Sequence, residues 1–584
     1  MAGRAVLIQS SLSTIPAYVM QCASLPSKIH NGIDRISRNF LWGSTESVRK
    51  MHWVGWSKIT KPKEEGGLGF QTAKGRNTAL LAKLNWRFNS EKDSLWAQVL
   101  RKKYCTRQRL NSNNTHKLPC SQVWKGIKVG QETFQKGVRW TLGHNSNLSL
   151  WYDKWSSSGP LRLAVQGPLT WEEDNFQVKD VLSLTGWSWE KVSLDIPTEI
   201  KLEIQATPSA LSVGSMDKMC WAGDPKGSFN LKSAYRLAVG NEINNFDGGW
   251  IWQAKTLPRI QIFVWRCLHN SLGVKTCLNA RGLSIDPLCP LCQKHPETII
   301  HSLRDCDLVK EVWANLGVQG TSSGFYGSTL NLWLSKNAKA AHTVGQHNLP
   351  WKSVFLFAIW TIWKRRNLLV FQNKPLNSNL HSEILHKVLE FTHCAVNIRE
   401  ATHHVLKPVR WEKPAIGWRK LNYDGSSLGN PGRAGGGGLI RDEEGNWVLG
   451  YSRQIGITSS FIAELWALRD GLMICVDRNF PAVVVEMDAK VIIEVLNNPN
   501  NTNLIISSIV DDCRKLASRI PRIQFEHCYR EANRSADMLA RMGANQSSSF
   551  SFHSSPPEDV KPLLDFDISE LYLNRRCPVP LVFF

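Results

Sequence analysis

The chain has 584 residues, which is too long for one ordinary hydrophobic core, so its length predicts several domains. A hydrophobic fraction of 42% is typical of globular proteins, and no stretch reaches the ~18 uncharged apolar residues that a membrane span needs. The net charge of +22 favours nucleic acid as a partner over a merely solvated basic surface, and residues 1–110 alone hold 19 Lys or Arg against 6 Asp or Glu.

The N-terminal residues do not have the pattern of a secretory signal peptide. One basic residue, Arg4, precedes an uncharged stretch that Gln9, several serines and Pro16 interrupt. The 14 cysteines are scattered apart from one tight cluster, which favours a reducing compartment with one metal site over a disulfide framework. We therefore expect an intracellular protein, in the nucleus or the cytoplasm.

Composition and periodicity divide the chain into six segments. A helical segment comes first, and a loop-rich segment full of tryptophans follows it; we expect those tryptophans to pack in a core. A compact unit around the cysteine cluster comes next, then a helical segment that ends in a proline-containing linker. A unit of clear strands and helices precedes a serine-rich tail that we expect to be flexible. The predicted boundaries are 1–110, 111–229, 230–316, 317–417, 418–545 and 546–584.

The cysteine cluster has the spacing Cys289-x2-Cys292-x8-His301-x4-Cys306. Two thiolates two residues apart can bind one ion from a tight turn, and His301 with Cys306 would complete a tetrahedron. Three sulfurs and one imidazole suit structural Zn²⁺, and a complete tetrahedron leaves no open position for catalysis. The sequence therefore predicts a zinc site, with His295 as a competing ligand.

Four carboxylates stand out in the segment of strands and helices. Its pattern predicts three strands, a helix, a strand, a helical region, a strand and a final helix. Asp424 lies in the first strand, and Glu464 lies at the edge of the buried stripe of the first helix. Asp488 ends an apolar strand, and Asp537 lies near the start of the last helix. Each acid alone also fits a turn, a cap or a solvated surface.

If the four acids converge, their charges repel one another unless cations bind. Such a site should collect Mg²⁺ or Mn²⁺. Two such ions about 4 Å apart can activate a water molecule and stabilise the leaving 3′ oxygen of a phosphodiester. Convergence of the quartet therefore predicts a two-metal nuclease.

The cysteine block resembles the zinc-binding domain that follows the reverse transcriptase of plant non-LTR (LINE-type) retrotransposons. The matching elements include "PRIQIFVWR", the C-x2-C pair, the "ET" dipeptide and the H-x4-C pair. The N-terminal runs "NFLWG" and "WSKITKPKEEGGLGF" resemble the segment just downstream of such a polymerase. No tyrosine precedes a paired aspartate here, so we expect no reverse transcriptase activity; the chain resembles the part of the element that follows the polymerase catalytic core.

Residues 418–545 resemble ribonuclease H type 1. Asp424, Glu464, Asp488 and Asp537 match that family's four catalytic, metal-binding acids in order and local context. The resemblance also implies a catalytic role for His527, and contact with nucleic acid for Asn533. His527 lies in a strand-like run, although the family carries its histidine on a mobile loop. The implied substrate is an RNA–DNA hybrid, whose RNA strand is recognised through its 2′-hydroxyl groups.

The sequence thus predicts a multidomain chain with a C-terminal α/β ribonuclease H-like fold, a mixed five-stranded sheet with helices. A mainly helical zinc-binding module and a helical remnant of the polymerase C-terminal region precede it. The predicted function is metal-dependent endonucleolytic hydrolysis of RNA in RNA–DNA hybrids. The alternatives are a catalytically silent nucleic-acid-binding protein and a degenerate retroelement fragment.

Overall fold

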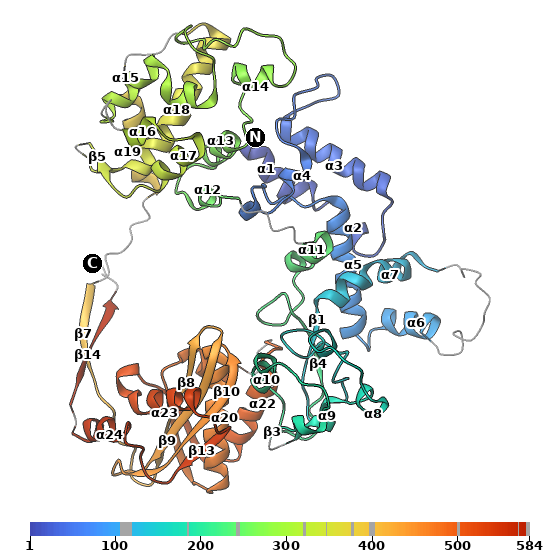
Figure 1. Ribbon diagram of the computed structural model, residues 1–584, viewed down its shortest axis with the longest axis vertical. Coiled ribbons are helices and arrows are strands. Elements are labelled where there is room, and N and C mark those ends of the chain that lie inside the picture. The colour runs from blue at the N-terminus through green and yellow to red at the C-terminus, as the bar shows by residue number, and fades with distance from the viewer. Residues whose placement is uncertain are drawn as a thin grey trace. The chain divides into compact units, whose positions relative to one another are not determined.

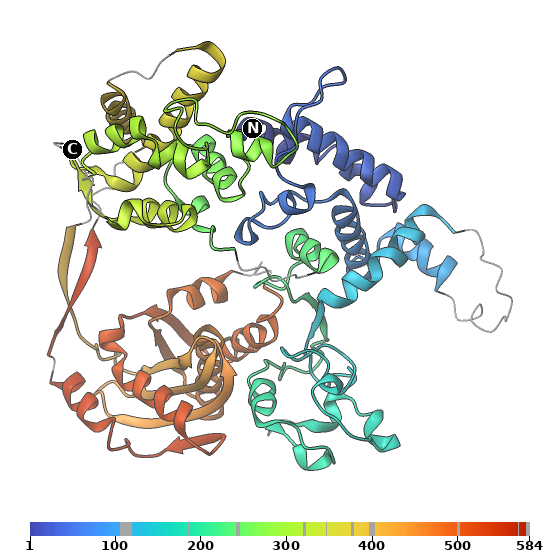
Figure 2. The same cartoon turned by 45° about the horizontal axis from the view of Figure 1, so that its top comes forward.

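The computed structural model of the chain contains two compact units, each made of segments that are distant in sequence (Figures 1 and 2). The first comprises Met1–Asn85, Ser94–Thr133 and Tyr235–Arg399, and the second comprises Trp86–Asp93, Phe134–Ala234 and Glu400–Phe584. The structure describes residues 1–105, 120–183, 186–240, 246–318, 323–345, 347–374, 379–395, 403–498, 503–569 and 571–579.

The first unit is helical, as the sequence predicted for residues 1–110. Its largest core joins the N-terminal helices to the cysteine module and includes Trp265, Trp313 and Phe355. The apolar run Val354–Trp363 lies in a helix with mostly buried side chains, and no helix in the described part of the chain is long and apolar enough to cross a membrane. The principal helices are α1 (Ala2–Leu7), α3 (Ser27–Trp42), α5 (Ala73–Ser90), α6 (Leu95–Tyr104), α7 (Gln122–Gly137), α11 (Leu231–Val239), α13 (Pro258–Leu268), α15 (Asp307–Asn315), α17 (Leu330–Lys339), α18 (Trp351–Gln372) and α19 (Leu380–Ala395).

The second unit is built on a mixed six-stranded sheet with the order β12-β11-β8-β9-β10-β13. β11 pairs in parallel with both β8 and β12, and the other neighbours are antiparallel. The strands are β8 (Arg419–Gly429), β9 (Gly432–Arg441), β10 (Trp447–Thr458), β11 (Ala482–Met487), β12 (Arg522–His527) and β13 (Phe550–His553). The helices are α20 (Ser460–Asp477), α21 (Lys490–Asn497), α22 (Ser507–Ser518), α23 (Arg534–Asn545) and α24 (Lys561–Ile568).

The glycine run Gly435–Gly438 in β9 allows helices to pack directly on both faces of the sheet. A Cβ atom at Gly437 would lie 2.4 Å from the backbone of α23, and one at Gly436 would lie 3.1 Å from the Ala467 side chain of α20. Because successive side chains of a strand point to opposite faces, α20 and α23 cover opposite faces. The sheet is therefore sandwiched between these two helices.

The structure differs from the sequence-based expectation after residue 545. Residues 550–553 form β13, the sixth strand of the sheet that was expected to have five, and residues 561–568 form α24. Val560 and Leu564 pack on Leu539 of α23, and Asp567 forms a buried ion pair of 2.8 Å with Arg441. The serines and prolines of this segment suggested a tail, but its spaced apolar residues complete the domain.

Most of the tryptophan-rich segment, residues 134–229, belongs to the same unit as the sheet, whereas its described residues 120–133 belong to the first unit. Trp151 and Trp155 are fully buried, and Trp187 stacks between Trp155 and Trp189 at centroid distances of 5.3 and 5.2 Å. The prediction that the tryptophans of this segment pack in a core is confirmed for these four, but it is wrong for Trp171, which is 83% exposed. Of the short elements of this segment, β1 (Val138–Thr141) and α10 (Thr198–Gln205) contribute side chains to that core, and β4 (Lys218–Trp221) pairs with β1.

Residues 205–212 contact the sheet domain through hydrogen bonds to buried groups. The Asp512 carboxylate of α22 accepts bonds from the backbone N–H of Leu211 at 2.8 Å and of Ser212 at 3.2 Å. Arg469 of α20 donates to the Ser209 carbonyl at 3.0 Å. These bonds make the preceding segment an integral part of the unit.

Replacing Asp512 by alanine should destabilise this contact strongly. The substitution leaves two backbone N–H groups without their acceptor and the buried Arg469 guanidinium without its carboxylate partner, so we expect a loss of about 2–4 kcal/mol of unfolding free energy. Asp511→Ala is the matched control, because Asp511 is 42% exposed and pairs with Lys218 at the surface, where such pairs contribute less than about 1 kcal/mol. Denaturant unfolding of the full chain measures both; equal losses would contradict the buried role.

Candidate active site and metal centre

The structure brings three of the four predicted acids together. Asp424 lies in β8, Glu464 in the first turns of α20, and Asp488 directly after β11. One carboxylate oxygen of each lies within 4.8 Å of the others. Asp537, in the first turn of α23, lines the same cavity and is near enough to Asp424 for its charge to raise the pKa of that carboxyl group. All four predicted acids therefore border one cavity of about 510 Å³.

The close approach of α20 to β8 depends on Gly425. A Cβ atom at this position would lie 2.1 Å from the backbone nitrogen of Glu464. Any larger residue would push the start of α20 away from the strand. The "DG" dipeptide, which alone is typical of a turn, therefore positions Glu464 beside Asp424.

Burial and mutual repulsion raise the pKa of two of these carboxyl groups. Burial is the main cause of the raised pKa of Asp424, and the charges of Asp488 and Asp537 add to it. For Glu464, burial again raises the pKa most, followed by the charges of Asp424 and Asp488. Glu464 Oε2 is buried and has no hydrogen-bond partner among the described residues. An orphaned oxygen among crowded carboxylates fits a divalent cation, since oxygen ligands are those that Mg²⁺ prefers.

Arg530 is a site residue that the sequence reasoning missed. It lies in the short 3-10 helix Arg530–Ala532, and its guanidinium donates to Asp488 at 2.7 Å while its side chain stays 84% exposed. The only feature of the sequence that marks Arg530 is its positive charge, seven positions before Asp537 in the run "YREANRSAD". The periodicity of strands and helices does not identify a residue in such a loop.

The two other predicted site residues, Asn533 and His527, occupy different environments. Asn533 lines the cavity, but its amide is buried and donates to the Tyr423 carbonyl at 2.9 Å, so it fixes the start of α23 to β8. His527 is exposed at the end of β12 and contacts the Tyr529 ring at a centroid distance of 5.5 Å. His527 is absent from the described lining of the cavity.

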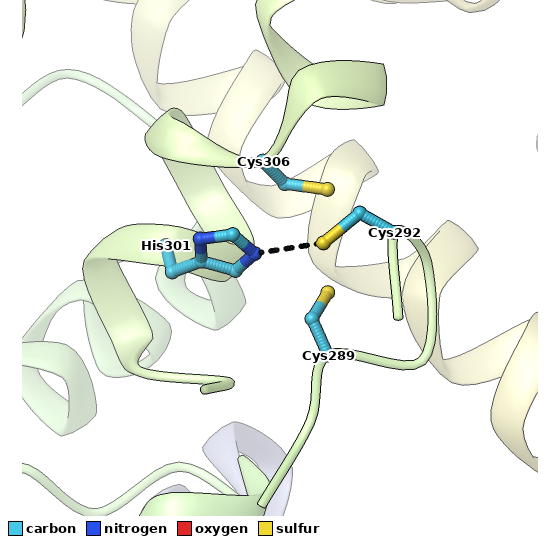
Figure 3. Close-up of side chains that lie close together, drawn as sticks. All are labelled: Cys289, Cys292, His301 and Cys306. Atoms are coloured by element: carbon cyan, nitrogen blue, oxygen red, sulfur yellow. Dashed lines mark hydrogen bonds between the residues drawn. The ribbon is translucent and has the colours of Figure 1, made fainter. Parts of the chain in front are cut away.

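The four predicted zinc ligands converge in the first unit (Figure 3). One ligand atom each from Cys289, Cys292, His301 and Cys306 lies within 4.8 Å of the others, and Cys292 Sγ lies 3.4 Å from His301 Nε2. Figure 3 shows the three sulfurs and the imidazole pointing toward one another. His295, the competing ligand, is exposed and lies outside this cluster, and its carbonyl instead accepts a bond from the Cys289 N–H.

Contacts within the cluster shift the pKa values of its thiols and imidazole in directions that favour a metal. Hydrogen bonding with Cys306 lowers the pKa of Cys289 to about 3, and the same bond raises the pKa of Cys306. Hydrogen bonding with Cys289 also raises the pKa of His301. The cluster therefore stabilises a thiolate, which is the form of cysteine that binds Zn²⁺.

The glutamate of the "ET" dipeptide has a structural role beside this cluster. Glu297 is fully buried and accepts two bonds of 2.6 Å from the Arg366 guanidinium of α18. It also accepts the Lys275 N–H at 2.8 Å. Glu297 thus joins the cysteine module to α18.

Comparisons with known proteins agree with this architecture. Residues 422–543 match the family model described as "Reverse transcriptase-like", and residues 229–313 match "zinc-binding in reverse transcriptase". The chain thus combines a zinc-binding domain of the reverse transcriptase type with a ribonuclease H-like domain.

One relative is similar to this chain over nearly its whole length. An Arabidopsis thaliana protein, "Putative ribonuclease H protein At1g65750", is 32% identical over 576 residues, which cover 97% of this chain and 93% of that protein. The chain belongs to the family of that relative, the plant retrotransposon-derived proteins with a ribonuclease H domain. The predicted resemblance and the predicted fold class are confirmed.

Other similarities cover parts of the chain. The A. thaliana "Uncharacterized mitochondrial protein AtMg00310" is 32% identical over 142 residues, 24% of this chain and 92% of that protein. Ribonuclease H1 of Halobacterium salinarum is 25% identical in sequence and covers 22% of this chain and 98% of that chain, with a TM-score of 0.21. LC11-RNase H1 in complex with an RNA/DNA hybrid is 28% identical in sequence and covers 22% of this chain and 96% of that chain, with a TM-score of 0.19.

Replacing Asp424 by asparagine should stabilise the metal-free protein. A carboxyl whose pKa is raised in the folded state destabilises the fold once the pH exceeds its unfolded value, so at pH 7.5 the loss of this charge is favourable. We expect a melting temperature about 2–4 °C higher without metal, and a smaller stabilisation by Mg²⁺ than in the parent. The exposed Asp477→Asn, at the far end of α20, should change neither value. A parental Mg²⁺ effect in the Asp424 variant would contradict this account.

Proposed function

We propose that the chain is a metal-dependent endonuclease that hydrolyses the RNA strand of RNA–DNA hybrids. The observation that carries this proposal is the cluster of Asp424, Glu464 and Asp488 around an open cavity, with the Glu464 Oε2 atom lacking a partner among the described residues. The ribonuclease H-like domain and the name of the full-length relative support the same reaction. Selectivity for the RNA strand would come from contacts with its 2′-hydroxyl groups.

The donor set fits Mg²⁺ or Mn²⁺. Asp424, Glu464, Asp488 and Asp537 would hold two ions, which supply an activated water and stabilise the leaving 3′ oxygen when they are bound. The chain's own residues hold the carboxylates in place: Gly425 allows the contact of α20 with β8, and Asn533 fixes the start of α23. His527 would assist the reaction from the end of β12.

A second candidate is nucleic-acid binding without cleavage. Two of the acids already have arginine partners, since Arg530 pairs with Asp488 at 2.7 Å and Arg541 pairs with Asp537 at 2.9 Å. These pairs compete with metal ions for the carboxylates. Both arginines are mostly exposed, so the energy of each pair is small and a divalent ion can replace it.

We also propose that the chain does not synthesise DNA. Its only adjacent aspartates, Asp511 and Asp512, lie in α22. Asp512 is buried and binds the backbone of Leu211 and Ser212, which is a structural role.

The cysteine cluster is proposed to bind one structural Zn²⁺ ion. Three sulfurs and one imidazole form a complete tetrahedral set without an open position. The ion would displace the thiol protons of the cluster, and so fix the module that Glu297 joins to α18.

Cleavage of a labelled RNA–DNA hybrid in Mg²⁺ or Mn²⁺ tests the nuclease. The full chain should cut only the RNA strand, and Glu464→Gln or Asp537→Asn should slow cleavage at least about a hundredfold, because each removes a ligand charge. Glu494→Gln is the control, since this acid of α21 is exposed and is absent from the described lining of the cavity. Salt-sensitive binding of the hybrid without any cutting would favour the second candidate.

Metal analysis of the purified chain tests the zinc site. The parent should contain about one zinc ion per chain, and Cys292→Ser should lose most of it and melt at a lower temperature. Cys277→Ser should keep the ion, because this thiol lies in the same module but outside the cluster. A zinc-free parent that melts unchanged in the presence of a chelator would contradict the proposal.

A further inference from the structure

Beyond the sheet, the second unit contains a separate two-stranded ribbon. β7 (His403–Val409) pairs antiparallel with β14 (Leu573–Val579), with Lys407 opposite Arg575 and Leu406 opposite Arg576. The ribbon is not hydrogen-bonded to the six-stranded sheet, and both views show it extending away from that sheet (Figures 1 and 2). It therefore forms an arm on the nuclease domain.

The base of the ribbon is firmly anchored. Trp411, two residues after β7, is buried against Ala532, just before α23. The Trp411 indole donates to Asn422 Oδ1 at 3.0 Å, and the Arg441 guanidinium lies 3.5 Å from the centre of the Trp411 ring. Asn422 belongs to β8, the strand that also carries Asp424. The base of the ribbon is thus fixed to a strand that forms the active site.

The ribbon is basic and carries no acid. Residues 403–411 and 571–579 include Lys407, Arg410, Arg575 and Arg576, but no Asp or Glu. Arg576 is exposed and has no ion-pair partner among the described residues. Lys407 is also exposed, and its ammonium lies 5.1 Å from the centre of the Tyr529 ring. A surface with this charge is complementary to a polyanion.

The ribbon is continuous with the cavity of the four acids. Leu573, the first residue of β14, lines that cavity, and so does Glu531, which pairs with Arg575 at 2.8 Å. Cations thus extend from the acids to the ribbon, along a path that a nucleic acid bound at the cavity can follow. The arginines that line the cavity are Arg530, Arg534 and Arg541.

We propose that the β7–β14 ribbon binds the sugar-phosphate backbone of the hybrid away from the scissile phosphate, a role that rests on the proposed function. Each strand has 7 residues and spans roughly 20 Å, since a strand rises about 3.4 Å per residue. Phosphates of one strand are about 3.4 Å apart along the helix axis, so the ribbon is long enough to contact several of them. Lys407 and Arg575 supply the contacts, because they lie opposite each other and share the face of the ribbon that also carries Leu573; Arg575 in addition pairs with Glu531.

The test compares two double variants of the full chain with the same change of charge. Lys407→Gln with Arg575→Gln, which removes both cations from the face of the ribbon that carries Leu573, should raise KM for a hybrid of about 20 base pairs roughly tenfold in 0.1 M salt and leave kcat unchanged. The salt dependence of binding should become shallower by about two counterions. Arg478→Gln with Arg519→Gln is the control, because these exposed residues precede β11 and β12, at the opposite end of the strands from Asp488.

Varying the length of the hybrid distinguishes the loss of phosphate contacts in the ribbon variant from a general effect of the substitutions on the structure. With a hybrid of about six base pairs, too short to reach along the ribbon, the parent and the ribbon variant should have equal KM values. A parent that cuts hybrids while the ribbon variant keeps the parental KM and salt dependence would overturn the ribbon proposal alone. The same unchanged KM and salt dependence would be found if the ribbon bound another protein chain instead of the hybrid. A parent that cuts no hybrid would overturn the proposed function and the ribbon proposal together.

Discussion

Repulsion between carboxylates held close together is the constraint on which the candidate active site depends. Asp424, Glu464 and Asp488 come from a strand, a helix and the end of a second strand, and none of these elements can move apart without disturbing the core. Gly425 permits the contact that places Glu464, and burial raises the pKa of Asp424 and Glu464. The fold thus maintains an unfavourable charge arrangement that a divalent cation would relieve.

The surrounding structure supports this arrangement through buried polar contacts. Asn533 bonds the Tyr423 carbonyl, and Arg441 links α24 to Asn422 of β8. Asp512 binds the tryptophan-rich segment on the side of α22. Each contact satisfies groups that would be costly to bury alone, so the segments on either side of the ribonuclease H-like core are parts of one unit.

The sequence predicted that the acids converge because each falls at a position that the strand and helix pattern identifies. Asp488 ends a continuous apolar strand, and Glu464 borders the buried stripe of α20. The convergence of three cysteines and one histidine was equally clear from their spacing. Periodicity could not reveal Arg530 in its short loop helix, the pairing of β7 with the distant β14, or β13 and α24, because these depend on tertiary contacts.

Anomalous diffraction from crystals of the full chain soaked in Mn²⁺ would reveal whether the crowded carboxylates bind a metal ion. We expect anomalous density between the carboxylates of Asp424, Glu464 and Asp488, close enough for each to be a ligand. Crystals that show bound Mn²⁺ elsewhere on the chain but none between these carboxylates would contradict this expectation.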